Sequence, residues 1–288
     1  YEMSASLVGS EMCIRDSAML TAALIFGKGK FVYITLAVAF AYGVTGFLDD
    51  SIKIRYKRNL GLRPYQKIIL QLSIALIVAF VVYKNELIRG DVYIPFTKNT
   101  VSLGWGVIPL VVFIFIATTN SVNLTDGLDG LAASTTLVYM AGIAAIIAIV
   151  AADADKNGLS LYVKEYQGLL TVCFATVGSL AGFLLFNCFP AKIFMGDVGS
   201  LALGGVVACV SILGRLSLYI PILGVMFATS AVSDIIQVVH YKRTKRRVFL
   251  MAPFHHHLQK KGLSETRIGF LYSTITGIVA LICVLTLI

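Results

Sequence analysis

Polar residues that could do chemistry are concentrated in residues 120–131, which read Asn-Ser-Val-Asn-Leu-Thr-Asp-Gly-Leu-Asp-Gly-Leu. Long apolar runs at 103–117 and 131–151 flank them. If those runs cross a membrane, polar groups pressed against them are costly and are usually kept for function. Carboxylates and amides beside glycines, where backbone N–H groups can approach closely, suit a phosphate, a metal or a nucleoside. A capped loop between helices is the alternative, but a cap needs only one such residue.

A second polar cluster is the pair Asp49 and Asp50, followed by Lys53, at the end of an apolar run. Adjacent carboxylates near a helix C-terminus oppose the helix dipole and repel each other. A cation or a basic ligand must therefore offset them, and Lys53, one turn further on, could partly do so. A solvated acid pair at the membrane interface is the alternative.

A third cluster is residues 186–200, in which Asp197 lies between Gly196 and Gly199. We expect a glycine turn there, with a backbone that can come close to a ligand. A hard cation such as Mg²⁺ binds few protein carboxylates and several phosphate or water oxygens. One Asp in such a turn is weak evidence for a Mg²⁺ site. The evidence is stronger because two other acidic segments are expected on the same face.

A fourth cluster, residues 251–262, contains three successive histidines, His255, His256 and His257. On an extended segment, His255 and His257 would share a side and His256 would face the opposite one. That arrangement does not suit a three-histidine metal site, whereas imidazoles beside Lys and Arg suit phosphate binding. A solvated basic loop or a basic helix on anionic lipid is the alternative.

The composition indicates which elements must position these residues. Of 288 residues, 58% are hydrophobic and only 14% are charged, against about 25% charged in soluble domains. We therefore expect an all-α polytopic membrane protein, with room for about nine helices of roughly 20 residues each. The net charge of +9 then belongs to loops facing anionic lipid and cytosol, and no nucleic-acid partner is expected. The five cysteines show no paired spacing, so neither disulfides nor a zinc site is expected.

Apolar runs follow one another along the chain without a soluble domain between them. The first, 18–26, is too short and resembles the remainder of a span. Full candidates lie at about 31–48, 68–83, 103–119, 131–151, 168–186, 200–213, 218–239 and 267–288. Residues 84–104, between two candidates, alternate polar and apolar and predict a small hairpin.

Basic residues predict the orientation of these spans. The loops around 49–67, 120–130, 187–199 and 240–266 share one face and carry most of the Lys and Arg residues, including the run 242–247. By the positive-inside rule this face is cytoplasmic. All four polar clusters fall on it. Together they suit Mg²⁺-assisted phosphoryl transfer between a soluble phosphate-bearing substrate and a lipid in the bilayer.

The four clusters, read together over residues 18–288, resemble the motifs of the polyprenyl-phosphate sugar-1-phosphate transferases. The histidine triple and the Met-Gly-Asp context at 195–197 are similar to the branch that acts on phospho-MurNAc-pentapeptide. The resemblance implies a ten-helix fold, often a homodimer, in the bacterial inner (plasma) membrane, with a cytoplasmic active-site cleft. It also implies transfer of phospho-MurNAc-pentapeptide from UDP-MurNAc-pentapeptide to undecaprenyl phosphate with Mg²⁺. The products are lipid I and UMP, in peptidoglycan synthesis.

The resemblance also implies roles for individual residues. Asp197 is the main Mg²⁺ ligand and Asn123 helps to form the metal and phosphate site. Asp49 and Asp50 face the lipid phosphate, with Asp49 the usual candidate base. The nucleoside pocket, in which Phe194 stacks on uracil, is lined by Asp126, Gly127, Asp129, Asn187 and Phe194. Two further catalytic candidates are His256 and His257. Three further candidates for substrate binding are Lys53, Gln237 and His255.

Two departures from the family pattern are visible. The first transmembrane helix and the basic Gly-rich loop after it are replaced by residues 1–17, which we interpret as non-native sequence; a flexible native terminus is the alternative. We therefore expect this chain to insert normally but to have little activity until that segment is restored. Gln259 stands where the family often has Glu, a change that looks tolerable.

Three alternatives stay open at this point. Within the superfamily, the chain could transfer GlcNAc-1-phosphate from UDP-GlcNAc to a polyprenyl phosphate, which the histidine triple disfavours. From another class, it could be a cation-coupled transporter, but transporters place acids near mid-membrane and often show related halves. In the reaction itself, direct attack by the lipid phosphate and a covalent aspartyl-phosphate intermediate are both compatible with the sequence.

Overall fold

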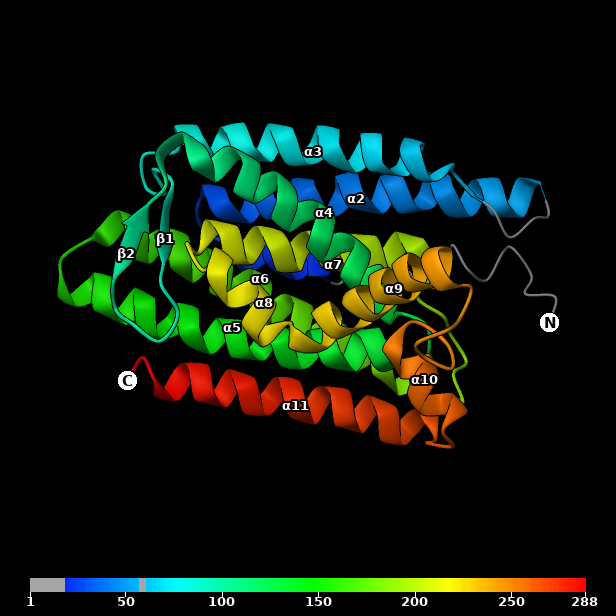
Figure 1. Ribbon diagram of the computed structural model, residues 1–288. Coiled ribbons are helices and arrows are strands. Elements are labelled where there is room, and N and C mark those ends of the chain that lie inside the picture. The colour runs from blue at the N-terminus through cyan, green and yellow to red at the C-terminus, as the bar shows by residue number, and fades with distance from the viewer. Residues whose placement is uncertain (1–18, 57–60) are drawn as a thin grey trace.

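Long apolar helices make up most of the part of the chain that the computed structural model describes, residues 19–56 and 61–288 (Figure 1). Within these residues, seven helices are long and apolar enough to cross a membrane. They are α2 Lys30–Arg55, α3 Pro64–Lys84, α4 Val107–Thr125, α5 Leu131–Lys156, α6 Ser160–Asn187, α7 Gly196–Leu213 and α11 Glu265–Leu285. The predicted all-α polytopic membrane fold is confirmed.

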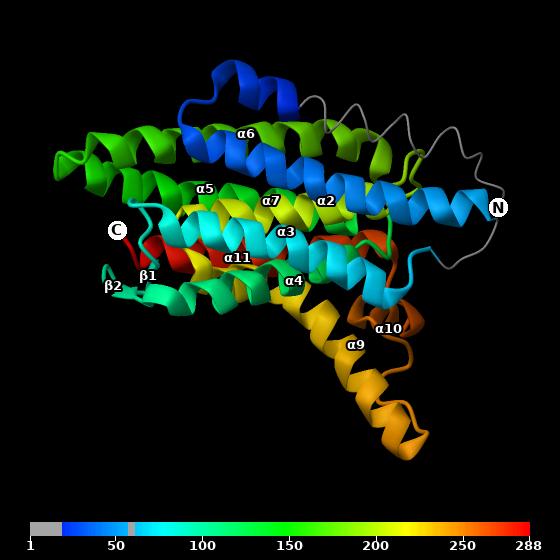
Figure 2. The ribbon, with the colours of Figure 1, turned by 90° about the horizontal axis from the view of Figure 1, so that it is seen from above.

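A further candidate span is bent. The segment Ser217–Leu223, which ends in the short helix α8 (Ile220–Leu223), meets α9 (Val225–Thr244) at 77°, so the pair is either a broken span or a re-entrant loop. The described residues therefore hold seven or eight candidate spans, against the nine expected. The expected remainder of a span is present as a helix over residues 19–26, which lies alongside α6 (Figure 2). The interpretation of residues 1–17 lies outside the described residues.

The predicted hairpin is present. Strands β1 (Asp91–Tyr93) and β2 (Thr100–Ser102) pair antiparallel, and the 3-10 helix η1 (Gly104–Gly106) leads from them into α4. A second 3-10 helix, η2 (Ser217–Tyr219), precedes α8, and between α7 and η2 lies Arg215, which binds the hairpin. Its side chain lies 2.8 Å from Asp91 Oδ2, and its carbonyl accepts from Tyr93 N at 2.8 Å. This end of the bundle is opposite the end that carries the helix α10 (Phe254–Lys260) (Figure 1).

Helix α7 lies in the middle of the bundle, and every residue from Gly199 to its end is buried. Glycines allow it to approach its neighbours. A Cβ atom at Gly204 would lie 2.6 Å from the Cα of Thr119 in α4, and one at Gly205 would lie 2.9 Å from the ring of Tyr42 in α2. Gly46 of α2 likewise leaves room for the backbone at Asp197. The N-terminus of α7 is thereby brought against the C-terminal turns of α2.

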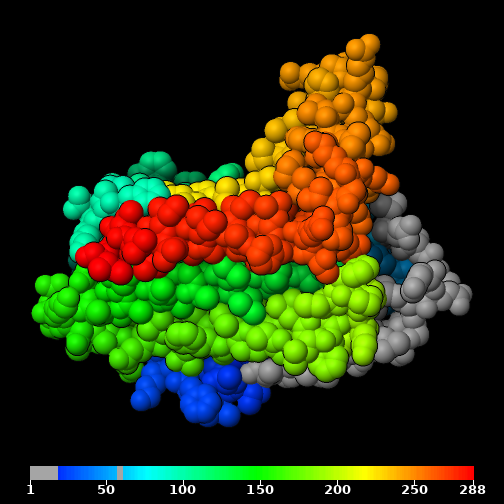
Figure 3. Space-filling view, turned by 90° about the horizontal axis from the view of Figure 1, so that it is seen from below, coloured from blue at the N-terminus to red at the C-terminus, as the bar shows by residue number. Residues whose placement is uncertain are grey.

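Helix α9 departs from the bundle. Together with the residues that follow it, the helix stands out from the body of the molecule (Figures 2 and 3). Exposed apolar side chains cover its projecting part, including Val232, Ile235, Ile236 and Val239. Its last turn and the next residues are basic, from Lys242 to Arg247.

The close approach of α7 to α4 predicts the effect of adding one methyl group. Gly204→Ala forces the α4 backbone to move, and overpacking of this kind costs about 1–3 kcal/mol. We expect a lower midpoint of thermal unfolding in detergent. The matched control is Gly182→Ala in α6, where a Cβ would have no heavy atom within 4 Å. Equal midpoints for both variants would show that the α4–α7 contact does not limit stability.

Candidate active site

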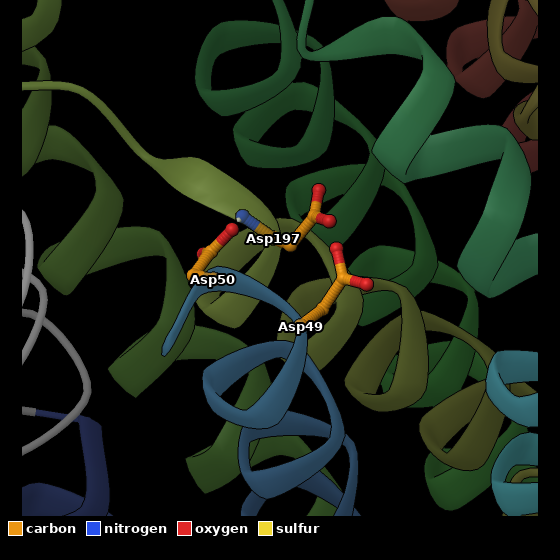
Figure 4. Close-up of side chains that lie close together, drawn as sticks. All are labelled: Asp49, Asp50 and Asp197. Atoms are coloured by element: carbon orange, nitrogen blue, oxygen red, sulfur yellow. Dashed lines mark hydrogen bonds between the residues drawn. The ribbon is translucent and has the colours of Figure 1, made fainter. Parts of the chain in front are cut away.

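Three carboxylates meet where α2 and α7 touch. Asp49 and Asp50 belong to the last two turns of α2, and Asp197 to the first turn of α7. An oxygen from each lies within 4.8 Å of the others. The carboxylates of Asp49 and Asp197 lie close together, and Asp50 points at the backbone nitrogen of Asp197 (Figure 4).

Asp50 caps α7 from another helix. One carboxylate oxygen accepts from the backbone N–H of Asp197 at 2.9 Å and of Val198 at 3.3 Å. The first N–H groups of a helix lack partners within it, and a negative charge there is favourable. The expected glycine turn around Asp197 is therefore wrong. Asp197 is helical, and Gly196 before it has a φ of +64°.

Two lysines offset the carboxylates. Lys53 Nζ lies 2.7 Å from oxygens of both Asp49 and Asp197 and 3.1 Å from Asp50. Lys67 of α3 adds a contact of 3.2 Å with Asp197. The expectation that Lys53 compensates the acid pair is confirmed. Sequence reasoning missed Lys67, which it counted only as a marker of the cytoplasmic face.

Asp49 is held from two directions. Its side chain is 5% exposed, and its Oδ1 accepts from the backbone N–H of Leu62 at 2.7 Å while Oδ2 faces Lys53. Gly61 lies directly against it, because a Cβ there would come 2.5 Å from Oδ1. The carboxylate is thus fixed by donors, as an ionised acceptor would be.

The polar stretch at 120–131 is only partly a loop. Helix α4 continues to Thr125, so Asn120 and Asn123 are helical, contrary to expectation. Asn123 Nδ2 donates to Asp197 Oδ1 at 2.6 Å and to Ser200 Oγ at 2.8 Å. Asn120 pairs instead with Gln71 of α3. Asn123 therefore orients the carboxylate of Asp197, and direct metal ligation by its oxygen stays a prediction.

The turn after α4 contacts the loop after α6. Asp129 Oδ2 accepts from Ala191 N at 2.9 Å, and buried Asn187 donates to the carbonyl of Ile193 at 2.7 Å. Phe194 follows with a side chain that is 45% exposed. These contacts shape the two loops, and Phe194 is accessible to a ligand. The nucleoside pocket expected from these residues and Asp126 stays a prediction.

The histidines lie on a helix, α10, so the alternation of side chains on an extended segment does not apply to them. His255 is fully buried, its ring 4.4 Å from that of His256. Burial, and then His256 beside it, lowers the pKa of His255 to about 3. It is thus neutral at physiological pH and cannot neutralise a phosphate. Both rings lie against Gly127, where a Cβ would come 3.0 Å from His256 Nε2.

His257 and Gln237 hold the loop between α9 and α10. His257 Nδ1 accepts from Leu250 N at 3.1 Å, and its ring stacks on Phe254. Gln237 Oε1 accepts from the backbone N–H groups of Val248 and Phe249, both at 3.0 Å. A surface hollow of about 400 Å³ lies beside this loop, lined in part by Gln237, Lys242, Arg247 and Met251. Gln237 therefore lines this hollow, and His257 helps to hold the loop beside it.

The acid cluster suits a divalent cation. Carboxylate oxygens are the ligands that such hard cations prefer. The ammonium of Lys53 already lies at 2.7 Å from two of these carboxylates, so the site attracts positive charge. Among the described residues, this is the one group of three or more His, Cys, Asp or Glu side chains placed to hold a metal.

This helical bundle, with a candidate metal site at one end, has the architecture expected of a membrane transferase. The sequence model of glycosyl transferase family 4 matches residues 32–215, and the chain belongs to this family. Its curated relatives share the name of one enzyme within this family. It is 43% identical to the phospho-N-acetylmuramoyl-pentapeptide-transferase of Clostridium novyi, over 86% of this chain and 72% of that protein. The enzymes of that name from Clostridium botulinum (strain Eklund 17B) and Bacillus mycoides are each 45% identical. They match 86% and 83% of this chain, and 72% and 69% of their own.

The acid cluster predicts a metal-dependent gain in stability. A ligand that binds only the folded state at 100 times its Kd adds about 2.7 kcal/mol. We expect Mg²⁺ to raise the thermal midpoint of the chelator-treated protein, and Asp197→Asn to abolish that rise. The control is Asp153→Asn, because Asp153 is half exposed near the end of α5 and pairs only loosely with Lys156 at 3.8 Å. A full Mg²⁺ effect in Asp197→Asn would contradict the assignment.

Proposed function

We propose that this protein transfers phospho-MurNAc-pentapeptide from UDP-MurNAc-pentapeptide to undecaprenyl phosphate, forming lipid I and UMP. The observation that carries the proposal is the cluster of Asp49, Asp50 and Asp197 with Lys53 and Lys67 at one end of the bundle. Carboxylates that can hold a cation, beside lysines that can bind phosphate, suit transfer between two phosphate-bearing substrates. The name shared by the relatives supports this choice of substrates.

We place the site at the cytoplasmic face of a bacterial plasma membrane. Several Lys and Arg residues lie at the same end of the bundle as the site, at the described ends of α2, α3 and α9: Lys53, Arg55, Arg63, Lys67 and the run from Lys242 to Arg247. An excess of Lys and Arg marks the cytoplasmic side of membrane proteins. A nucleotide-linked substrate would be available on that side.

The reaction needs no strong base. An oxygen of the lipid phosphate attacks the sugar-linked phosphorus, and the bond from that phosphorus to the bridging oxygen breaks. UMP leaves with the electron pair. A phosphate monoester has a second pKa near 6, so it is already mostly a dianion at pH 7. The attacking oxygen therefore has little proton to lose.

Asp49 then acts by position and charge. Both of its oxygens have donors, from Leu62 and Lys53, and its side chain is almost fully buried. We assign it to holding Lys53 where the ammonium can meet a phosphate, and not to attack on phosphorus. Lys53 and Lys67 would bind and orient the phosphates of the two substrates.

Asp197 is the proposed main ligand of Mg²⁺, with Asp49 beside it and Asn123 fixing its orientation. When bound, Mg²⁺ would supply neutralisation of the diphosphate and of the leaving UMP. Phe194, exposed at the edge of the site, would stack on uracil.

The two rival functions are less well supported. The curated relatives carry the name of the pentapeptide transferase, which does not favour transfer of GlcNAc-1-phosphate. For a cation-coupled transporter, acids near the middle of the spans are expected. The acid cluster instead joins the last turns of α2 to the first turn of α7, at one end of the bundle.

The proposed function predicts a substrate-dependent release of UMP. We expect lipid I and UMP in equal amounts from UDP-MurNAc-pentapeptide, undecaprenyl phosphate and Mg²⁺, and little UMP when UDP-GlcNAc replaces the donor. The assay uses two forms of the protein: the chain as printed, and the chain with a transmembrane helix and a basic Gly-rich loop added before residue 18. Loss of a metal-bound carboxylate removes several kcal/mol of transition-state stabilisation, so Asp197→Asn should be at least a thousandfold slower. A preference for UDP-GlcNAc as donor, or no lipid I from either form of the protein, would contradict the proposal.

A further inference from the structure

A chain of hydrogen bonds links the histidine helix to the turn after α4 through Glu265, in the first turn of α11. His256 Nδ1 lies 3.2 Å from Gln259 Oε1. Gln259 Nε2 donates to Glu265 Oε1 at 3.1 Å, and the backbone N–H of Asp129 donates to Glu265 Oε2 at 3.3 Å. Neither Glu265 nor this link is apparent from the sequence motifs.

The chemistry of these groups fixes the direction of each hydrogen bond. An ionised carboxylate only accepts, so the two donors facing Glu265 must be the N–H of Asp129 and the NH₂ of Gln259. With its NH₂ turned to Glu265, Gln259 presents its oxygen to His256. The Nδ1 of His256 must then carry the hydrogen, because two acceptors cannot face each other. In the neutral ring, Nε2 is left as the acceptor.

The position of that acceptor matters for the site. Nε2 of His256 lies against Gly127, in the turn that follows Asn123 and precedes Asp129. Asn123 holds Asp197, so the same short segment touches both the acid cluster and His256. The His256 side chain is only partly buried, which leaves it within reach of a ligand bound at this turn.

We propose that Glu265 is a positioning residue: it locks the amide of Gln259, which keeps His256 in the Nδ1–H tautomer and presents Nε2 to the nucleotide-sugar substrate. The substrate group that meets Nε2 is an N–H or O–H donor. The inference rests on the proposed transfer reaction for the identity of that substrate, but the tautomer is a property of the protein alone.

A purely structural role for Glu265 predicts a different outcome. If Glu265 only anchored the turn at Asp129, Glu265→Gln would be nearly silent, because the new amide oxygen could still accept that N–H. In the positioning role, the new NH₂ faces Gln259, whose amide must turn over to accept from it. Gln259 then presents NH₂ to His256, which shifts the ring to the Nε2–H tautomer.

The test is a swap of the two side chains. We expect Glu265→Gln to lower kcat/KM by roughly tenfold to a hundredfold, the usual range for a hydrogen bond to a charged group, with little change in thermal midpoint. The double variant Gln259→Glu/Glu265→Gln restores every donor–acceptor pair and should recover most of the activity. The control is Glu86→Gln, an exposed acid at the hairpin end of the bundle.

A second measurement does not depend on the reaction. The chain has four histidines, so ring ¹⁵N chemical shifts can be assigned with single substitutions. We expect His256 to be protonated at Nδ1 in the unmodified protein and in the double variant, and at Nε2 in Glu265→Gln. Absence of lipid I from both forms of the protein assayed above would remove the proposed function, while this readout would still test the tautomer. An unchanged tautomer, or a double variant no better than Glu265→Gln, would overturn the positioning role.

Discussion

Electrostatic compensation where α7 meets α2 is the constraint on which the rest of the site depends. Three carboxylates within 4.8 Å of one another repel strongly in a membrane protein, where little water screens them. Two lysines and the free N–H groups at the start of α7 offset that repulsion. The compensation works only because glycines allow the helices to pack closely. The charge cluster therefore depends on the packing of α7 against its neighbours. A site built in this way is ready to exchange ammonium groups for a metal ion or to share them with phosphates.

The end of α4 couples this cluster to the histidine helix. Asn123 holds Asp197, and four residues later Gly127 lies against His255 and His256. Asp129 then reaches both the loop after α6 and Glu265 at the start of α11. One turn of chain thus touches most of the elements that bear candidate residues. This explains why a short stretch combines amides, carboxylates and glycines: each serves a different neighbour.

Much of the fold could be predicted because apolar length and helix formation are local properties. The spans, the hairpin at 84–104 and the contact of Lys53 with the acid pair all follow from spacing within one segment. Lys67, Ser200 and Glu265 were missed because their partners lie on other helices. The residues next to them in the sequence give no sign of these contacts. The errors share a cause. Asn120, Asn123 and Asp197 were expected in loops because they are polar. They lie in helices instead, where side chains of neighbouring helices satisfy them.

The most direct test of the central claim, that Asp197 holds a catalytic cation, is a change of ligand chemistry at this one position. Asp197→Cys replaces a hard oxygen by a soft sulfur, which binds Mg²⁺ poorly and Cd²⁺ well. We predict that lipid I formation by this variant is lost in Mg²⁺ and recovers at least tenfold in Cd²⁺. Asp50→Cys, altered at the residue that caps α7, should show no such recovery. Equal activity of Asp197→Cys in the two metals would contradict the account.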